Sequence, residues 1–197
     1  MVFIWVKSLW LSINARLIIV NLAITRATWR KIWNFVLFQI GWFACILGAA
    51  HHQIGLALAI SLICIGIYLW LHQNARSEHE LLLKVFIYGL IADTILVQLG
   101  WIRFESDFPF TAVSPVWMWA LWLVFATTLK ESMAWLQGKN GLAAVLGAIA
   151  GPLCYEAGVR LGAASWPSSE DRVFALIYLA VVWAIAMPVF LFFAKEK

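Results

Sequence analysis

The stretch GLAAVLGAIAGPLCYEAGVRLGAA, residues 141–164, decides the fold class of this chain. Nearly all of its residues are apolar or small, and only Glu156 and Arg160 are charged. A helix needs about 20 mostly apolar residues to cross a hydrocarbon core of roughly 30 Å, and this run is long enough. It therefore predicts a transmembrane helix with two charged residues that need partners.

Five further apolar runs flank this one along the chain. They cover residues 32–50, 54–71, 81–100, 116–129 and 173–194. The run 116–129 is short and can continue towards Trp135. All of these runs are continuously apolar rather than alternating, which argues against a β-barrel. We therefore predict an all-α fold, a polytopic membrane bundle of about six transmembrane helices, with residues 31–197 as a single transmembrane domain.

The composition excludes several classes of protein. Hydrophobic residues are 64% of the 197 residues and charged residues 12%, whereas a soluble domain is roughly 45–50% apolar and about 25% charged. A soluble enzyme, a disordered chain and a disulfide scaffold are therefore excluded. Cys45, Cys64 and Cys154 lie inside apolar runs without a CxxC pair, so we expect small buried side chains. We expect no metal site and no cofactor.

The net charge of +4 is concentrated at the N-terminus, since residues 1–31 hold five basic residues and no acid. It is not a basic face, so we expect no nucleic-acid partner. With both termini in the cytoplasm, 11 of the 14 Lys and Arg residues lie on that side, and only Arg103 and Arg172 lie opposite. Basic loops favour the cytoplasmic side, so we predict that both termini lie inside.

Residues 1–30 form a basic leader whose apolar stretches are interrupted by polar residues. We interpret this leader as an interfacial helix or a loosely structured segment. A start assigned too early also explains its weak pattern. A seventh span, which would place the N-terminus outside, is the alternative.

Charged residues inside predicted spans are candidates for a functional site, because a charge at the bilayer centre costs at least about 2.5–3.5 kcal/mol. Asp93 lies in the third span. Glu156 and Arg160 are four residues apart in the fifth span, so they can pair on one face. Counting along the helices places these three residues, with His52, near the outer mouth of the bundle. A network of ion pairs that only holds helices together is the structural alternative.

A second polar layer is expected near the inner face. It includes Asn34, Thr127 and Thr128, and we expect the two threonines to bond to their own helix. Lys130 and Glu131 follow them, and we expect these two side chains to be solvated at the membrane surface. Glycines at 147, 151, 158 and 162 share one face of the fifth span and predict close helix packing.

Several segments together resemble a family of small bacterial inner-membrane proteins, the domain of unknown function 2878. They are residues 33–50 (WNFVLFQIGWFACILGAA), Ala92-Asp93, residues 119–129 (WALWLVFATTL) and residues 151–163 (GPLCYEAGVRLGA). The family pattern continues after the double threonine with Asn-His-Ser, whereas this chain has Lys130-Glu131-Ser132, which weakens a role for the inner layer. The positions that match the family pattern are Asn34, Gln39, Asp93, Thr127, Thr128, Tyr155 and Arg160.

The resemblance implies a multi-pass protein of the cell inner membrane whose activity is not established. On its basis we add Gln39 and Tyr155 to the inner polar layer. Members are often encoded beside lipid-modifying enzymes such as cyclopropane-type fatty-acyl methyltransferases, which implies a link to lipid metabolism.

Three functions stay open at this point. The first is a lipid- or fatty-acid-pathway membrane protein, accessory or catalytic, which holds an acyl chain or another small amphipathic ligand between spans with its head group on Arg160. The second is a small ion- or proton-coupled transporter that uses Asp93, Glu156 and Arg160, since carboxylates in spans are common proton relays. The third is a structural or assembly subunit of a membrane complex. All three predict contact with the lipid bilayer, and the third adds a membrane-protein partner.

Overall fold

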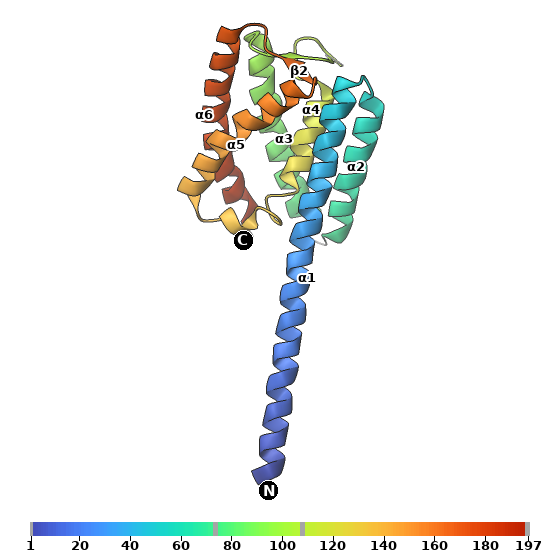
Figure 1. Ribbon diagram of the computed structural model, residues 1–197, viewed down its shortest axis with the longest axis vertical. Coiled ribbons are helices and arrows are strands. Elements are labelled where there is room, and N and C mark those ends of the chain that lie inside the picture. The colour runs from blue at the N-terminus through green and yellow to red at the C-terminus, as the bar shows by residue number, and fades with distance from the viewer. Residues whose placement is uncertain (1, 73–74, 107–108, 196–197) are drawn as a thin grey trace.

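A computed structural model describes residues 2–72, 75–106 and 109–195, with side chains from residue 25 onward apart from that of Ala75. Six α-helices form a bundle, as the sequence predicts (Figure 1). A 3₁₀ turn, η1 (Ala134–Leu136), lies between the fourth and fifth helices. Strands β1 (Arg103–Phe104) and β2 (Ala164–Ser165) pair antiparallel. The helices are α1 (Val2–Ala50), α2 (Ile54–Leu71), α3 (Ala75–Gln98), α4 (Val116–Ala126), α5 (Asn140–Arg160) and α6 (Ser169–Ala194).

Within the residues that the structure describes, four stretches of helix are long and apolar enough to cross a membrane. They are Thr25–Ala50, Ile54–Leu71, Asn140–Arg160 and Ser169–Ala194. Helices α3 and α4 differ from the predicted spans. Helix α3 begins at Ala75 rather than residue 81, with Arg76, Glu78 and Glu80 in its first two turns. Helix α4 is apolar but ends at Ala126, where the chain enters a series of turns.

Helix α1 runs without interruption from Val2 to Ala50, and its first half projects beyond the bundle (Figure 1). The end of the bundle from which α1 projects is called the lower end here, and the end where β1 pairs with β2 is the upper end. The leader, residues 1–30, thus continues the first span as helix from residue 2. Side chains of residues 2–24 lie outside the described part, so an interfacial basic surface on the leader stays a prediction.

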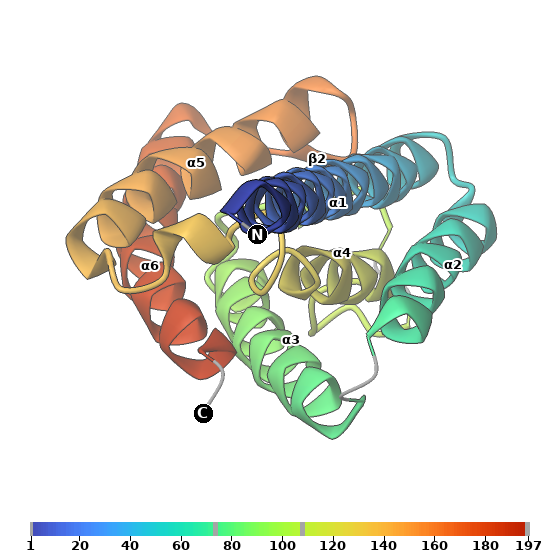
Figure 2. The ribbon, with the colours of Figure 1, turned by 90° about the horizontal axis from the view of Figure 1, so that it is seen from below.

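The short helix α4 lies at the centre of the packing, because it contacts α1, α2 and α3. Seen from below, α5 and α6 lie on one side of the bundle and α2 on the other, with α3 and α4 between them (Figure 2). Large side chains of α4, among them Trp117, Trp122 and Phe125, are buried. The most central helix is therefore one of the most aromatic, and its rings must be accommodated by small residues on its neighbours.

Glycines on neighbouring helices leave room for two of the tryptophan side chains, Trp122 of α4 and Trp183 of α6. A Cβ at Gly89 of α3 would overlap the ring of Trp122, and a Cβ at Gly147 or Gly151 of α5 would overlap Trp183 of α6. Gly158, in the same stripe, faces Ile46 of α1. The predicted packing role of the α5 stripe is confirmed for these three glycines, because small residues let helices approach closely. Gly162 lies past the end of α5 with a φ of +86°, a left-handed conformation that glycine adopts freely.

Candidate functional site

Asp93 lies at the centre of the bundle and is fully buried. The indole Nε1 of Trp122 donates a hydrogen bond to Asp93 Oδ2 at 2.7 Å, and the hydroxyl of Tyr155 donates to Asp93 Oδ1. One carboxylate from α3 thereby joins α4 and α5. A buried carboxylate is costly unless it is hydrogen-bonded, and here both oxygens have a donor.

Helix α6 supports this centre from its other side. Trp183 stacks on Trp122 with ring centroids 4.7 Å apart and an interplanar angle of 12°. The hydroxyl of Tyr178 donates to the carbonyl oxygen of Ala92, next to Asp93, at 3.0 Å. The Asp93 side chain of α3 is therefore bound directly by α4 and α5, and α6 supports its Trp122 partner and the neighbouring backbone.

A cavity of about 390 Å³ lies beside this centre, between α1, α4, α5 and α6. Trp122 and Tyr155, the two partners of Asp93, form part of its wall. Phe35 of α1 and Ala150 of α5 also line the cavity and are exposed, so it opens between these two helices. The other lining residues are mainly apolar or aromatic, and they include Phe38, Trp42, Leu121, Phe125, Met133, Trp135, Leu136, Leu146, Trp183 and Met187.

Glu156 forms a separate cluster at the upper end. Its carboxylate accepts from Arg160 at 3.2 Å, from Arg172 at 3.1 Å and from the indole of Trp166 at 3.1 Å. The predicted pairing of Glu156 with Arg160 is confirmed. Arg172, in the first turn of α6, is a partner that the sequence reasoning missed, although it is one of only two basic residues assigned to the outer side.

The four residues of the predicted outer cluster do not gather at one site. Tyr155 and Glu156 are consecutive on α5, so their side chains point about 100° apart, and Tyr155 rather than Glu156 reaches Asp93. The Arg160 side chain is 74% exposed and pairs only at the surface. His52 lies in the turn after α1, exposed and with a φ of 57°.

The inner polar layer is present at the lower end, built around Asn34. The Asn34 amide donates to the Thr127 carbonyl oxygen at 3.0 Å, and its Oδ1 accepts from the Ser132 hydroxyl at 2.8 Å. The hydroxyls of Thr127 and Thr128 bond back to the carbonyls of Val124 and Phe125, as expected. Asn34 therefore fastens α1 to the turns that follow α4.

The expectation that Lys130 and Glu131 are solvated is wrong. Their side chains are only 7% and 10% exposed. Lys130 Nζ donates to Glu78 Oε1 at 2.9 Å and to Ser77 at 2.7 Å. Helix α3 starts six residues earlier than the sequence predicts, and this extra helix brings Ser77 and Glu78 to Lys130.

Glu131 has two partners of its own. It accepts from Arg30 of α1, and its Oε1 lies 2.7 Å from Nε2 of His72, just past α2. The other ring nitrogen of His72 lies 2.7 Å from the carbonyl oxygen of Tyr68. The lower end of the bundle thus holds a network of charged groups in which the side chains of Glu78, Lys130 and Glu131 are buried and that of Arg30 is exposed.

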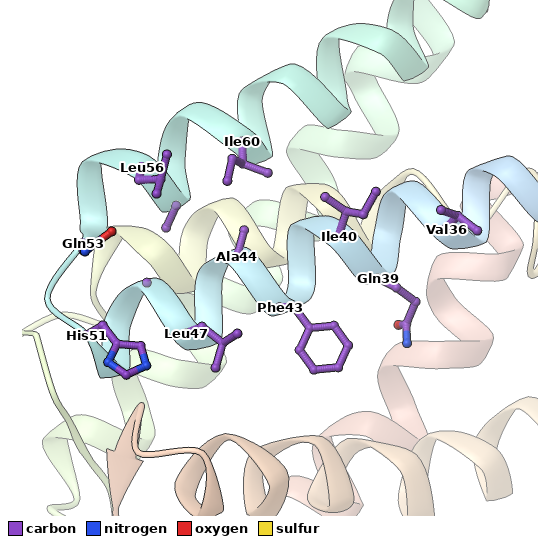
Figure 3. A pocket seen from close by; sticks show the side chains of 12 residues that line it. Val36, Gln39, Ile40, Phe43, Ala44, Leu47, His51, Gln53, Leu56 and Ile60 are labelled. Atoms are coloured by element: carbon purple, nitrogen blue, oxygen red, sulfur yellow. The ribbon is translucent and has the colours of Figure 1, made fainter.

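Gln39 and Tyr155 do not join the inner layer. Tyr155 binds Asp93, and Gln39 lines an apolar groove of about 580 Å³ between α1 and α2. Leu56 and Ile60 of α2 lie opposite Ile40 of α1 across this groove (Figure 3). Such a surface, apolar and open along two helices, is typical of a face that contacts lipid chains.

The cysteines and acidic residues form no metal site within residues 2–72, 75–106 and 109–195, where no group of three or more His, Cys, Asp or Glu side chains could hold an ion. Cys45 and Cys64 are buried, as expected, and Cys45 Sγ lies 3.2 Å from the Ser61 hydroxyl. Cys154 is exposed, which corrects the expectation that it is buried. It lines the cavity between α1 and α5.

The apolar helices and the buried polar centres define a polytopic helical membrane protein. The chain belongs to the family described as Protein of unknown function (DUF2878), whose model matches residues 31–189. That range contains Asn34, Asp93, Trp122 and Tyr155. No curated protein and no solved structure matches the chain.

Proposed function

We propose that the protein binds an acyl lipid inside its helix bundle and works in a lipid or fatty-acid pathway of a cell inner membrane. The observation that carries this proposal is the cavity of about 390 Å³ between α1, α4, α5 and α6. Small-molecule sites have volumes of about 300–1,000 Å³ and mostly apolar walls with few polar groups. The cavity fits both criteria.

The polar groups in its wall suit the polar end of such a ligand. The Tyr155 hydroxyl donates a hydrogen bond to Asp93, and the Ser132 hydroxyl donates a hydrogen bond to Asn34. Each oxygen keeps lone pairs that can accept a hydrogen bond. A hydroxyl or a protonated carboxyl on the ligand can donate to either of them. Arg160 does not line the cavity, so we no longer assign the head group to it.

Binding of palmitate to the full chain in detergent micelles tests the proposal. Ala150→Phe places a ring at the mouth of the cavity, at an exposed position where the fold has room for it. Val145→Phe is the matched control, because Val145 lies exposed on α5 and does not line the cavity. We expect Ala150→Phe to weaken palmitate binding at least tenfold and Val145→Phe to leave it unchanged.

Equal palmitate affinity of both variants, or no saturable binding to the wild-type chain, contradicts the proposal. Thermal unfolding of the two variants, measured in parallel, shows whether either has lost its fold.

A role as a structural or assembly subunit is the second candidate, and the Asp93 centre favours it. Both carboxylate oxygens are satisfied by neighbouring helices, as in a group that holds a bundle together. This candidate predicts that Asp93→Asn changes folding or complex formation and nothing else. The transporter hypothesis instead predicts that Asp93→Asn abolishes flux into proteoliposomes while the protein stays folded.

A further inference from the structure

A second cavity, of about 450 Å³, lies at the lower end between α1 and the end of α2. Its walls include Trp33 and Leu37 of α1 and Leu71 of α2. It is separate from the cavity beside Asp93. Asn34 lines the lower-end cavity, and Ser132, its hydrogen-bond partner, lines the other.

Two arginines of α1 line the lower-end cavity. Arg26 and Arg30 are four residues apart, so their side chains lie on one face of the helix. Glu131 of the charged network at the lower end holds Arg30 in place. Arg26 is exposed, and it forms no ion pair with any side chain of the described part of the chain. The cavity wall thus offers one fixed guanidinium and one that is free to bind an anion.

Tryptophan rings complete this wall. Trp29 and Trp33, also four residues apart, line the cavity and are 54% and 59% exposed. They lie at the start of the stretch Thr25–Ala50, which is apolar and long enough to span a membrane. Tryptophan and basic residues at the end of a span lie at the level of the lipid head groups. The membrane component that carries an anion at this level is the phosphate of a phospholipid.

We propose that this cavity binds the anionic head group of a membrane glycerophospholipid. The phosphate lies between the guanidinium groups of Arg26 and Arg30, and an acyl chain follows Trp33, Leu37 and Leu71. Arginine suits this ligand because its planar guanidinium can donate two parallel hydrogen bonds to one phosphate. A basic cleft between transmembrane helices is the usual form of such a site. Glu131, which neutralises only part of the positive charge, orients Arg30.

Binding of fluorescent phosphatidylglycerol to the full chain in detergent micelles tests this site. Each basic residue near a membrane surface contributes about 1 kcal/mol to the binding of an anionic lipid. We therefore expect Arg26→Gln to weaken binding about fivefold and Arg26→Gln/Arg30→Gln to weaken it further. The matched control is Arg76→Gln, because Arg76 is exposed on α3, pairs with Glu80 and does not line the cavity.

Two further probes identify the source of the phosphate. Diacylglycerol with the same fluorescent chain lacks the phosphate, and we expect it to bind more weakly and equally to all variants. Inorganic phosphate, added as a competitor, should not displace phosphatidylglycerol at comparable concentration, because it lacks the acyl chains.

Three results overturn the proposal: equal affinity of wild type and Arg26→Gln, an equal loss in Arg76→Gln, or displacement of the lipid by inorganic phosphate. Arg26→Gln removes no described contact, so its result counts even if the double variant Arg26→Gln/Arg30→Gln unfolds. The site is independent of the cavity of about 390 Å³ beside Asp93, called the acyl cavity from here on. Ala150→Phe should therefore leave phosphatidylglycerol binding unchanged.

Discussion

Trp122 of α4 donates its indole N–H to Asp93 of α3 across 2.7 Å, deep inside the bundle. The hydroxyl of Tyr155 donates a hydrogen bond to the other carboxylate oxygen of Asp93, so one acidic group accepts from two buried donors. Because the two rings also form a wall of the acyl cavity, the same contacts that hold three helices together shape the proposed binding site.

Removal of the Asp93 carboxylate should destabilise the protein. Asp93→Leu leaves the N–H of Trp122 and the O–H of Tyr155 buried without an acceptor, at a cost of about 1–3 kcal/mol each. Asp93→Asn keeps an acceptor and should lose less. Unfolding in detergent measures the loss of stability in both variants, Asp93→Leu and Asp93→Asn. Glu80→Gln, at the surface, is the control. Equal stability of the Leu variant and the wild type would show that the centre contributes nothing to the fold.

The close approach of α5 to Trp183 predicts a second effect on stability. Gly151→Ala places a methyl group where the ring of Trp183 lies. We expect the free energy of unfolding to fall by about 1–3 kcal/mol, as for other overpacked sites. Gly141→Ala, on the same helix with open space around it, should leave stability unchanged or slightly raised. Equal tolerance of both changes would contradict the packing described for α5 and α6.

The buried pair of Lys130 and Glu78 should show strong coupling. Lys130→Met leaves the Glu78 carboxylate buried with only the Tyr68 hydroxyl, at 2.5 Å, as a partner. Loss of one partner of a buried pair costs about 3–5 kcal/mol. We expect Glu78→Gln/Lys130→Met to be more stable than Lys130→Met alone, as a double-mutant cycle measures. Additive effects would mean that the two groups do not interact.

The distribution of Lys and Arg predicts that both termini lie in the cytoplasm. A fluorescent protein fused after Lys197 should therefore be fluorescent in a bacterial host, and alkaline phosphatase at the same position should be inactive. An active phosphatase fusion would reverse the proposed orientation.

The helical class of the fold could be predicted from hydropathy alone, because long and continuously apolar runs form membrane helices rather than the alternating strands of a β-barrel. The ends of α3 and α4 could not. Glu78 and Lys130 become buried only through each other, and neither residue's local sequence contains that information. Polar, charged segments at run boundaries resemble solvated loops until their tertiary partners are known.

Part of the site was within reach of the sequence. The sequence singled out Asp93 as a charged residue that needs partners, and Asp93 is buried inside the bundle. The Glu156–Arg160 pair followed from its spacing. The prediction that Asp93 and Glu156 belong to one cluster was wrong. Tyr155 and Glu156 are consecutive on α5 and point in different directions, and Tyr155 rather than Glu156 reaches Asp93. The role of Trp122 had a usable signal. A buried indole N–H needs an acceptor, and Asp93 is a natural one.

Photo-crosslinking with a diazirine derivative of palmitate, followed by mass spectrometry of the labelled peptides, tests the central claim most directly. The account predicts labels on side chains of the acyl cavity, such as Leu146, Cys154 and Trp122, and their loss in Ala150→Phe. Labels confined to lipid-facing side chains outside the cavity, such as Val145 and Ile149, with no change in Ala150→Phe, would contradict it.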